Sequence, residues 1–452
     1  MFFEINSAIS SVIWGPPMLA VFLGTGLFLS AKTGFYQISG IADWTKSTVG
    51  TLIGNRSNRK TDKNCISQVG ALTSSLAACL GTGNIVGVAT ALRAGGAGSV
   101  FWMCLSAILG MMTCCCENIL GIKYRIRNAS GRFSGGPMYY IEKGLGMKNL
   151  ARIYAVFLIG ASLGMGNMTQ SNSVAQGLSG FGISPFISAA ILCCAVLLSV
   201  SGGLKRITSI SQMLIPVLSG AFIFACFAVV FVNRENLLPS IKLVFSEAFS
   251  VKAVSGFGLA KAARYGISRG VFSNEAGLGS SAIIHASADC ENAAEQGKWG
   301  ILEVFIDTVF MCSITAAAIL TSGAIQDKSL DGVGLCAAVF ESIFGKAGGY
   351  FLDICICLFA FATLVAWSYY GKTGTEYLFG EKSGKIYNIV YAAAAFIGCI
   401  TKLDFVWSIS DTFNGLMAVP NIFAVLCLSK EAVAELGKEK RLARKPLHAN
   451  RL

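Results

Sequence analysis

Charged side chains are scarce in this 452-residue sequence: aspartate, glutamate, lysine and arginine make up only 13% of it, whereas 54% is hydrophobic. A soluble globular domain carries roughly 25% charged residues, so this chain cannot cover a water-facing surface of its size. A soluble globular protein is therefore excluded. Runs of about 20 apolar residues recur along the whole length, and each is long enough to cross a bilayer as a helix. The sequence predicts an all-α polytopic membrane protein.

Histidine is rarer still, with only His285 and His448 in the chain. Two imidazoles leave almost no basis for histidine-ligated metals or acid–base catalysis. The 16 cysteines lie mostly in apolar runs without metal-type CxxC pairs, so we expect buried small hydrophobic side chains rather than disulfides. HExxH, GxSxG and paired catalytic aspartates are also missing. We therefore expect neither an enzyme nor an organic cofactor.

Positive charge marks one side of the predicted membrane protein. The formal net charge is +12, but the lysines and arginines lie in loops and in the tail, which indicates topology rather than a nucleic-acid partner. We predict about eleven spans, at approximately residues 14–33, 66–94, 98–121, 151–177, 184–202, 210–233, 253–287, 299–322, 350–372, 384–401 and 405–429. The basic segments follow the first, third and eleventh spans, so all three lie on one side, which the positive-inside rule makes cytoplasmic. The N-terminus is then outside and the C-terminus inside.

Two of these spans are poor continuous helices. The second contains AACLGTGNIVG at 77–87, where each glycine costs roughly 1 kcal/mol of helix stability and Asn84 adds a polar group. The seventh contains GISRGVFSNEAGLGSS at 266–281, whose charged side chains cannot face lipid cheaply. Close packing of small residues is the alternative for the second span, and an extramembrane loop is the alternative for part of the seventh.

The two interruptions lie five spans apart. This spacing predicts two five-helix repeats of opposite orientation, 66–233 and 234–430, each beginning with a discontinuous helix. Residues 1–65 add an extra transmembrane helix and a basic loop, and 431–452 form a basic cytoplasmic tail. Paired broken helices bring unwound backbone together near the midplane, where N–H groups attract a carboxylate and carbonyls coordinate Na⁺. We predict a transporter for a small anionic or zwitterionic solute and a cation; a channel would instead need a filter or a ring of like charges.

Four runs resemble those of the bacterial alanine/glycine:cation symporters: GTGNIVG at 81–87, GGPMYY at 135–140, FSNEAGLGS at 272–280 and WSYYG at 367–371. The resemblance covers roughly residues 10–430. It implies the leucine-transporter-type 5+5 inverted repeat, with the first span outside the ten-helix core. It also implies Na⁺-coupled uptake of alanine or glycine by alternating access, in the bacterial plasma membrane, with the lipid bilayer and the amino acid as partners and no obligate protein partner.

The substrate is expected to bind between the two interruptions. We assign its carboxylate to the backbone around Thr82, Gly83 and Asn84, with the asparagine amide as a further donor, because glycine permits close approach of the solute to the main chain. The ammonium needs acceptors, which unwound carbonyls near Phe272 and Ser273 would provide.

Two further residues are candidates for the same pocket. Gln170, in the polar stretch of the fourth span, is placed to reach the solute; interhelical hydrogen bonding is the alternative role for that stretch. Trp367 and Phe272 are expected to wall the pocket and to exclude larger side chains by steric clash. Ordinary packing is the alternative for the tryptophan.

The cation site follows by analogy with the implied fold. Na⁺ is expected to bind the carbonyls of Ala77 and Leu80, at the end of the first half-helix, and the hydroxyl of Thr363 in the ninth span. Thr363 would otherwise hydrogen-bond its own helix. Na⁺ is the co-transported ion in this prediction.

The charged residues of the membrane interior have separate predicted roles. Arg264, Arg269 and Glu275 are expected to form an internal gate in which the carboxylate pairs with an arginine. Asp307 and Asp353, in the eighth and ninth spans, are the acids that would carry protons. Proton coupling is therefore the alternative to Na⁺ coupling.

Overall fold

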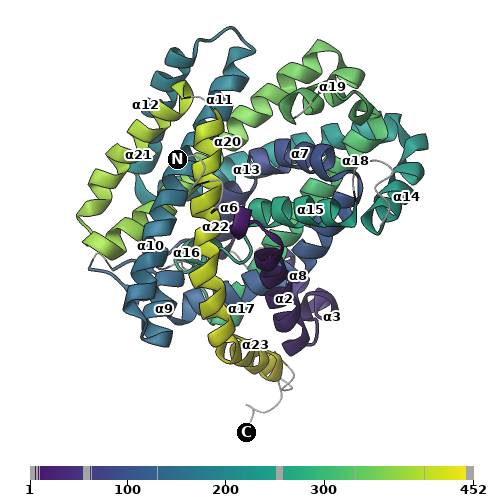
Figure 1. The fold of residues 1–452 in the computed structure, drawn as a ribbon. Coiled ribbons are helices and arrows are strands. Elements are labelled where there is room, and N and C mark those ends of the chain that lie inside the picture. The colour runs from purple at the N-terminus through teal and green to yellow at the C-terminus, as the bar shows by residue number, and fades with distance from the viewer. Residues whose placement is uncertain are drawn as a thin grey trace.

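The computed structural model describes residues 6, 9, 11–53, 62, 64–129, 131–250, 258–330, 332–401 and 403–443. These residues form a bundle of helices (Figure 1). The strands among them are β1 (Ile126–Arg127) and β2 (Phe133–Ser134), which pair antiparallel in one short hairpin. The predicted all-α class is confirmed.

The other elements of the described residues are helical. They are α2 (Pro16–Lys32), α3 (Tyr36–Ser39), α4 (Ile41–Ser47), α5 (Val49–Ile53), α6 (Gln68–Cys79), η2 (Thr82–Asn84), α7 (Val86–Gly95), α8 (Gly98–Lys123), α9 (Pro137–Leu145), α10 (Lys148–Leu163), η3 (Gly164–Met168), α11 (Thr169–Ser179), α12 (Pro185–Ser201), α13 (Gly203–Val232), η4 (Arg234–Asn236), α14 (Leu237–Ala248), α15 (Leu259–Asn274), α16 (Ser281–His285), α17 (Ala293–Val304), η5 (Phe305–Cys312), α18 (Ser313–Ser322), η6 (Ala324–Gln326), α19 (Gly332–Phe344), α20 (Lys346–Phe379), α21 (Ser383–Ile400), α22 (Leu403–Cys427) and α23 (Ser429–Ala443).

Among the described residues, six helical stretches are long and apolar enough to cross a membrane, or up to seven if α22 and α23, which meet at 59°, form one bent span. Helices α2 and α12 are apolar but have only 17 residues each, and α6–α7 and α15–α16 are interrupted. Each of the eleven predicted spans overlaps one of these elements. The connections predicted around 234–252 and 323–349 also contain helices, α14 and α19, which were not predicted.

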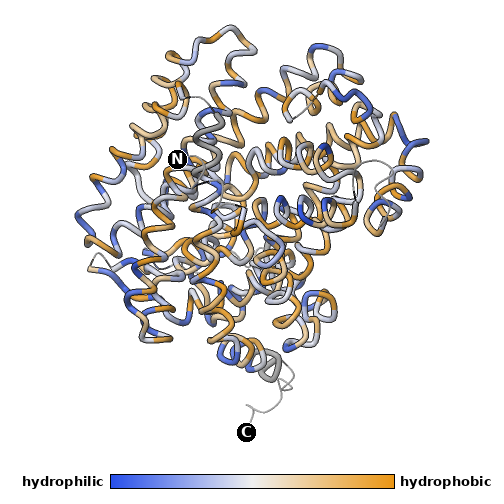
Figure 2. The backbone as a smooth tube through the Cα atoms, viewed as in Figure 1, coloured by the Kyte–Doolittle hydropathy of each residue, from blue (hydrophilic) through white to orange (hydrophobic). Residues whose placement is uncertain are grey.

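The outward face of the bundle is apolar. On α13, Met213, Val217, Phe224 and Phe231 are each at least 65% exposed, as expected for side chains that contact lipid. Figure 2 shows hydrophobic residues along most of the outer helices and hydrophilic ones gathered near α9 and α14. All sixteen cysteines are free and most are buried, which confirms their predicted role as small hydrophobic side chains.

Helix α8 is the scaffold on which the interrupted spans rest. It packs against α7, α15, α16 and α17, and its Cys114, Cys115 and Cys116 are fully buried or nearly so. Figure 1 places α6, α7 and α15 near the middle of the bundle. The end that carries Arg125, Arg132 and α23 is called the basic end below, and the other the opposite end.

Candidate substrate and cation sites

The second predicted span is interrupted at residues 80–85, as expected. Helix α6 ends at Cys79, and an extended Gly81 leads into the short turn η2 before α7 begins. The Asn84 side chain holds this turn, because its Oδ1 accepts a hydrogen bond from the Gly81 N–H at 3.2 Å. The same N–H also donates to the Cys79 carbonyl at 2.8 Å, so the asparagine and this carbonyl together replace the acceptor that a continuous helix would have provided.

The seventh predicted span is interrupted at residues 275–280. Helix α15 ends at Asn274, and Glu275 adopts a left-handed conformation with φ 56°. Gly277 and Gly279 follow with φ 96° and 78°, which glycine adopts at little steric cost. Left-handed backbone is unusual for glutamate, and its side chain is held: the carboxylate accepts hydrogen bonds from the Ser280 hydroxyl and the Trp367 indole N–H, the latter at 3.1 Å.

The two interruptions lie against each other. A Cβ atom built on Gly83 would lie 3.8 Å from the Ser273 Cα and 3.9 Å from the Phe272 ring. The Thr82 hydroxyl donates to the Gln170 Oε1 at 3.4 Å. The structure thus brings together Thr82, Gly83, Phe272, Ser273 and Gln170, all predicted to surround the solute.

A cavity of about 490 Å³ connects this region with the opposite end of the bundle. Thr82 lines it at the first interruption, Ser173 lines it from α11, and Arg93 and Asp353 line it farther along. The volume falls within the range of small-molecule sites. Thr82 is therefore reachable from the end opposite the basic one.

Trp367 lies away from this cavity. It is fully buried, its ring meets Tyr370 edge to face at 5.1 Å, and a Cβ on Gly166 would overlap it at 2.5 Å. Its indole N–H donates a hydrogen bond to the Glu275 carboxylate. In this conformation Trp367 supports the second interruption instead of facing the cavity as a wall.

Two of the predicted Na⁺ ligands, Ala77 and Thr363, meet near the end of α6. The Thr363 hydroxyl donates to the Ala77 carbonyl at 2.9 Å, and a Cβ on Gly81 would lie 2.8 Å from the same hydroxyl. Leu80 ends the helix one residue before this glycine. The oxygens are of the kind that coordinate Na⁺ at half-helix ends.

A second oxygen-rich cluster joins both interruptions and was not predicted as a unit. Asp307 lies fully buried in the π-helical segment η5. Its carboxylate accepts hydrogen bonds from the Asn84 amide at 2.8 Å, the Ser273 hydroxyl at 2.8 Å and the Thr308 hydroxyl at 2.6 Å. The sequence marked Asp307 only as an intramembrane acid; π-helical segments recur at functional sites, but hydropathy does not reveal them.

The predicted gate pair is not formed in this conformation. Glu275 is buried and bonded to Ser280 and Trp367, and among the described residues it has no arginine within ion-pair distance. Arg269 lies over the Phe272 ring at 5.6 Å, and Arg264 is exposed beside Tyr265.

Main-chain bonds close the basic end. The Ile66 N–H donates to the Ser287 carbonyl at 3.1 Å, and the Asp289 N–H donates to the Ile66 carbonyl at 2.9 Å. Arg125 donates to two carbonyls after α16, at 3.0 and 2.7 Å. The Ile66 bonds tie the start of α6 to the segment that follows α16, and Arg125 ties that segment to the end of α8.

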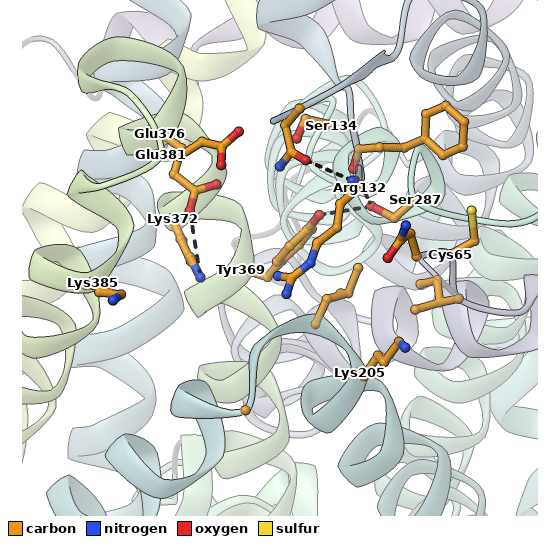
Figure 3. Close-up of a pocket in the computed structure, with 16 residues that line it drawn as sticks. Cys65, Arg132, Ser134, Lys205, Ser287, Tyr369, Lys372, Glu376, Glu381 and Lys385 are labelled. Carbon is orange, nitrogen blue, oxygen red and sulfur yellow. Dashed lines mark hydrogen bonds and ion pairs between the residues drawn. The ribbon is translucent and has the colours of Figure 1, made fainter. Parts of the chain in front are cut away.

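A separate cavity of about 280 Å³ lies at this closed end. Figure 3 shows Tyr369 bonded to Ser287 at its wall, with Arg132 beside Tyr369. It shares no lining residue with the 490 Å³ cavity. The cavity at the opposite end therefore reaches the first interruption at Thr82, whereas the cavity at the basic end is lined by no residue of either interruption.

Two solved structures share this arrangement of helices. MhsT in complex with L-phenylalanine superposes with a TM-score of 0.62 at 14% identity, over 83% of this chain and 93% of that one. A Na⁺-coupled sialic acid symporter in a substrate-bound outward-open state gives 0.56 at 12% identity, over 98% of both chains. The fold is therefore that of the leucine-transporter-type membrane transporters.

Sequence relatives define the family within this class. A model of the sodium:alanine symporter family matches residues 1–446. The sodium/alanine symporter AgcS of Methanococcus maripaludis is 38% identical over 442 residues, 96% of each chain. GlnT of Bacillus subtilis, named as a probable sodium/glutamine symporter, is 34% identical over 97% of this chain and 91% of its own. The chain belongs to the sodium:alanine symporter family, and it is a transporter, not an enzyme.

Proposed function

We propose that this protein carries alanine or glycine into the cell together with Na⁺ by alternating access. The observation that carries the proposal is the contact between the two interruptions at Thr82–Gly83 and Phe272–Ser273, with a cavity that reaches Thr82 from the opposite end. Family membership supports Na⁺ coupling and an amino-acid substrate. Interrupted helices in a membrane are tolerated where they line such a cavity.

The amino acid binds between the two interruptions in this proposal. Backbone N–H groups around Thr82–Asn84 receive the carboxylate, and carbonyls near Phe272 and Ser273 receive the ammonium. The Phe272 ring would lie only 3.9 Å from a Cβ placed on Gly83, and this short distance supports a small side-chain pocket. A glutamine carrier among the relatives makes the size of this pocket the feature to test.

Na⁺ has two candidate positions. The first combines the Ala77 and Leu80 carbonyls with the Thr363 hydroxyl. The second is the Asp307 cluster with Asn84 and Ser273, where the buried carboxylate has no lysine, arginine or histidine partner among the described residues. An unpaired buried charge is costly, so a bound cation would stabilise this cluster and both interruptions with it.

Proton coupling is the second candidate function, and the same aspartate favours it. A proton on Asp307 would neutralise the carboxylate as Na⁺ would, and intramembrane acids serve as proton carriers in transporters. Both candidates share the substrate site and differ only in the cation that Asp307 receives.

The orientation follows from charge. We take the basic end as cytoplasmic, which makes this conformation outward-facing: Thr82 is reachable from outside, and the Ile66 main-chain bonds close the inside. Cation binding at the ends of the half-helices would raise the affinity for the amino acid, and the amino acid would raise the affinity for the cation by the same factor.

The test is uptake of labelled alanine into proteoliposomes under an inward Na⁺ gradient. Choline replaces Na⁺ at constant pH in the matched sample. Saturable uptake that requires Na⁺ supports the symport. Uptake that persists in choline and follows a pH gradient instead supports proton coupling, and uptake that needs neither gradient contradicts both.

A further inference from the structure

The cavity at the basic end has no residue in common with the proposed substrate and cation sites. Its volume of about 280 Å³ lies close to the lower end of the range of small-molecule sites, roughly 300 Å³. Its lining carries charges of both signs, from four basic side chains and two carboxylates: Arg132, Lys205, Lys372, Lys385, Glu376 and Glu381. A cavity of this size and lining suits a small molecule that carries both charges.

The charges of this lining compensate one another only in part. The Lys372 ammonium lies 3.8 Å from the Glu376 carboxylate, one helical turn along α20. Glu381 accepts a hydrogen bond at 2.7 Å from a main-chain N–H in the loop between β1 and β2. Arg132 and Lys205 have no carboxylate within ion-pair distance among the described residues. These two cations are therefore available to an anionic group.

The basic and acidic groups come from different walls of the cavity. Arg132 belongs to the loop of the β1–β2 hairpin, and its Nη1 reaches the α12–α13 turn, where it lies 3.7 Å from a Cβ atom built on Gly203. Lys205 follows two residues later, in the first turn of α13. Glu376 and Glu381 lie at the end of α20 and in the turn after it. A carboxylate can therefore bind between the hairpin and α13, and an ammonium at the end of α20.

These two positions together select the kind of ligand. Guanidinium and ammonium groups make charge-assisted hydrogen bonds with a carboxylate, and carboxylates make them with an ammonium. A free amino acid carries both groups on one carbon atom. A phosphate or a simple carboxylate would bring negative charge toward Glu376 and Glu381 with no ammonium to offset it, and like charges repel. The lining therefore favours a zwitterion over a simple anion.

The walls of the cavity belong to segments that meet where the basic end is closed. The Ser287 hydroxyl, after α16, bonds to the Tyr369 hydroxyl of α20 at 2.9 Å (Figure 3) and donates to the Phe133 carbonyl of the hairpin at 3.3 Å. Ile66, whose main chain bonds to the same segment, also lines the cavity. A ligand that bridges the hairpin and α20 would therefore strengthen contacts that inward opening has to break.

We propose that this cavity is a second amino-acid site, which binds a free amino acid from the cytoplasm and holds the basic end closed. The inference rests on the proposed symport, in which the basic end is cytoplasmic. A ligand that binds the closed state more tightly than the open one shifts the equilibrium to the closed state, so accumulated amino acid slows further uptake. Because the ligand's charges are met by side chains of the protein alone, binding at this site needs no Na⁺.

Equilibrium binding of labelled alanine and glutamine to the purified protein tests the site directly. Choline replaces Na⁺, so that the Na⁺-dependent transport site stays empty. We expect saturable binding of both amino acids. Propionate, which lacks the ammonium, and ethylamine, which lacks the carboxylate, should each compete about tenfold more weakly than alanine, as for the loss of one hydrogen bond to a charged group. Absence of saturable binding in choline overturns the second site, and competition by propionate equal to that by alanine overturns its preference for a zwitterion.

Variants separate this site from the transport site. Arg132→Gln and Glu376→Gln should each weaken binding in choline about tenfold, because each removes one charged partner. Lys438→Gln removes a positive charge from α23, at the same end but outside the lining of the cavity, and should bind as wild type. Asn84→Ala, at the transport site, should also bind as wild type. Loss of binding in choline through Asn84→Ala would assign the amino acid to the transport site and overturn the proposal.

Transport tests the regulation. Right-side-out membrane vesicles are loaded with glutamine at a concentration that saturates binding in choline, and the initial rate of Na⁺-driven alanine uptake is measured. We expect internal glutamine to lower this rate at least about fivefold, the lower end of typical coupling between two sites, in the wild type and in Lys438→Gln but not in Arg132→Gln. A rate that internal glutamine leaves unchanged in the wild type overturns the regulation. Absence of Na⁺-driven uptake in every sample overturns the symport instead, an outcome that the binding measured in choline does not share.

Discussion

The two interruptions are built by different means. The first, at 80–85, has no left-handed residue and is held by one side chain, that of Asn84, which binds both the Gly81 N–H and Asp307. The second, at 275–280, is fixed in the backbone by a left-handed Glu275 and two glycines with positive φ. We infer that the first interruption responds to what occupies the Asp307 cluster, whereas the second is a rigid frame.

A side chain added at a glycine of the second interruption should destabilise the protein. Gly279→Ala places a Cβ at φ 78°, where it overlaps the Pro137 ring and lies 2.6 Å from the Asn421 Oδ1. Strain and overpacking together should destabilise the protein by about 3 kcal/mol, seen as a loss of monodisperse protein and a lower melting temperature. Gly24→Ala, which meets nothing within 4 Å, is the control and should melt at or above wild type.

A change at Asn84 should weaken cation binding at the first interruption. Asn84→Ala removes one donor from Asp307 and one acceptor from the Gly81 N–H, a loss of about 2 kcal/mol. We expect the Na⁺ concentration for half-maximal uptake to rise about 30-fold, while the protein stays folded. Asn172→Ala, which removes bonds from α11 to the carbonyls of Gly398 and Thr401, should leave that concentration unchanged. Equal effects of both variants would show that Asn84 contributes to packing and not to cation binding.

Substrate size should depend on the second interruption. Phe272→Ala removes a ring beside Gly83 and should let larger amino acids compete with alanine, with a gain of about tenfold for glutamine or leucine. Inhibition of labelled alanine uptake by each amino acid measures this. An unchanged order of competition would place the selectivity elsewhere in the cavity.

The smallest expected effect is at Thr363. Thr363→Ala removes the hydroxyl that meets Ala77 and should raise the Na⁺ requirement about fivefold, as for one hydrogen bond. Thr363→Ser keeps the oxygen and should behave as wild type. If uptake at limiting Na⁺ is the same in the alanine variant, this oxygen does not bind the cation.

The sequence could locate both interruptions because their signals are local. Glycine beside threonine and asparagine, and glycine beside charged residues, disfavour a continuous helix whatever surrounds them. The partners of Glu275 could not be located in the same way. Whether it meets Arg269 or Trp367 depends on how α15 and α20 are rotated about their axes, which hydropathy does not determine.

The same limit applies to the buried polar groups. Asp307 was visible only as an isolated acid of the membrane interior. Its cluster combines side chains from elements that are distant in sequence, Asn84 from η2 and Ser273 from α15. The spacing of residues along the chain does not predict such contacts between side chains of different helices.

The closure at Ile66 is formed from amide and carbonyl groups, so no side-chain replacement at Ile66, Ser287 or Asp289 deletes it directly. An alanine scan would therefore not detect these main-chain hydrogen bonds. Proline at 66 or 289 would remove the amide hydrogen and with it one of these hydrogen bonds. Any other substitution would weaken the bonds only by moving the two chain segments apart.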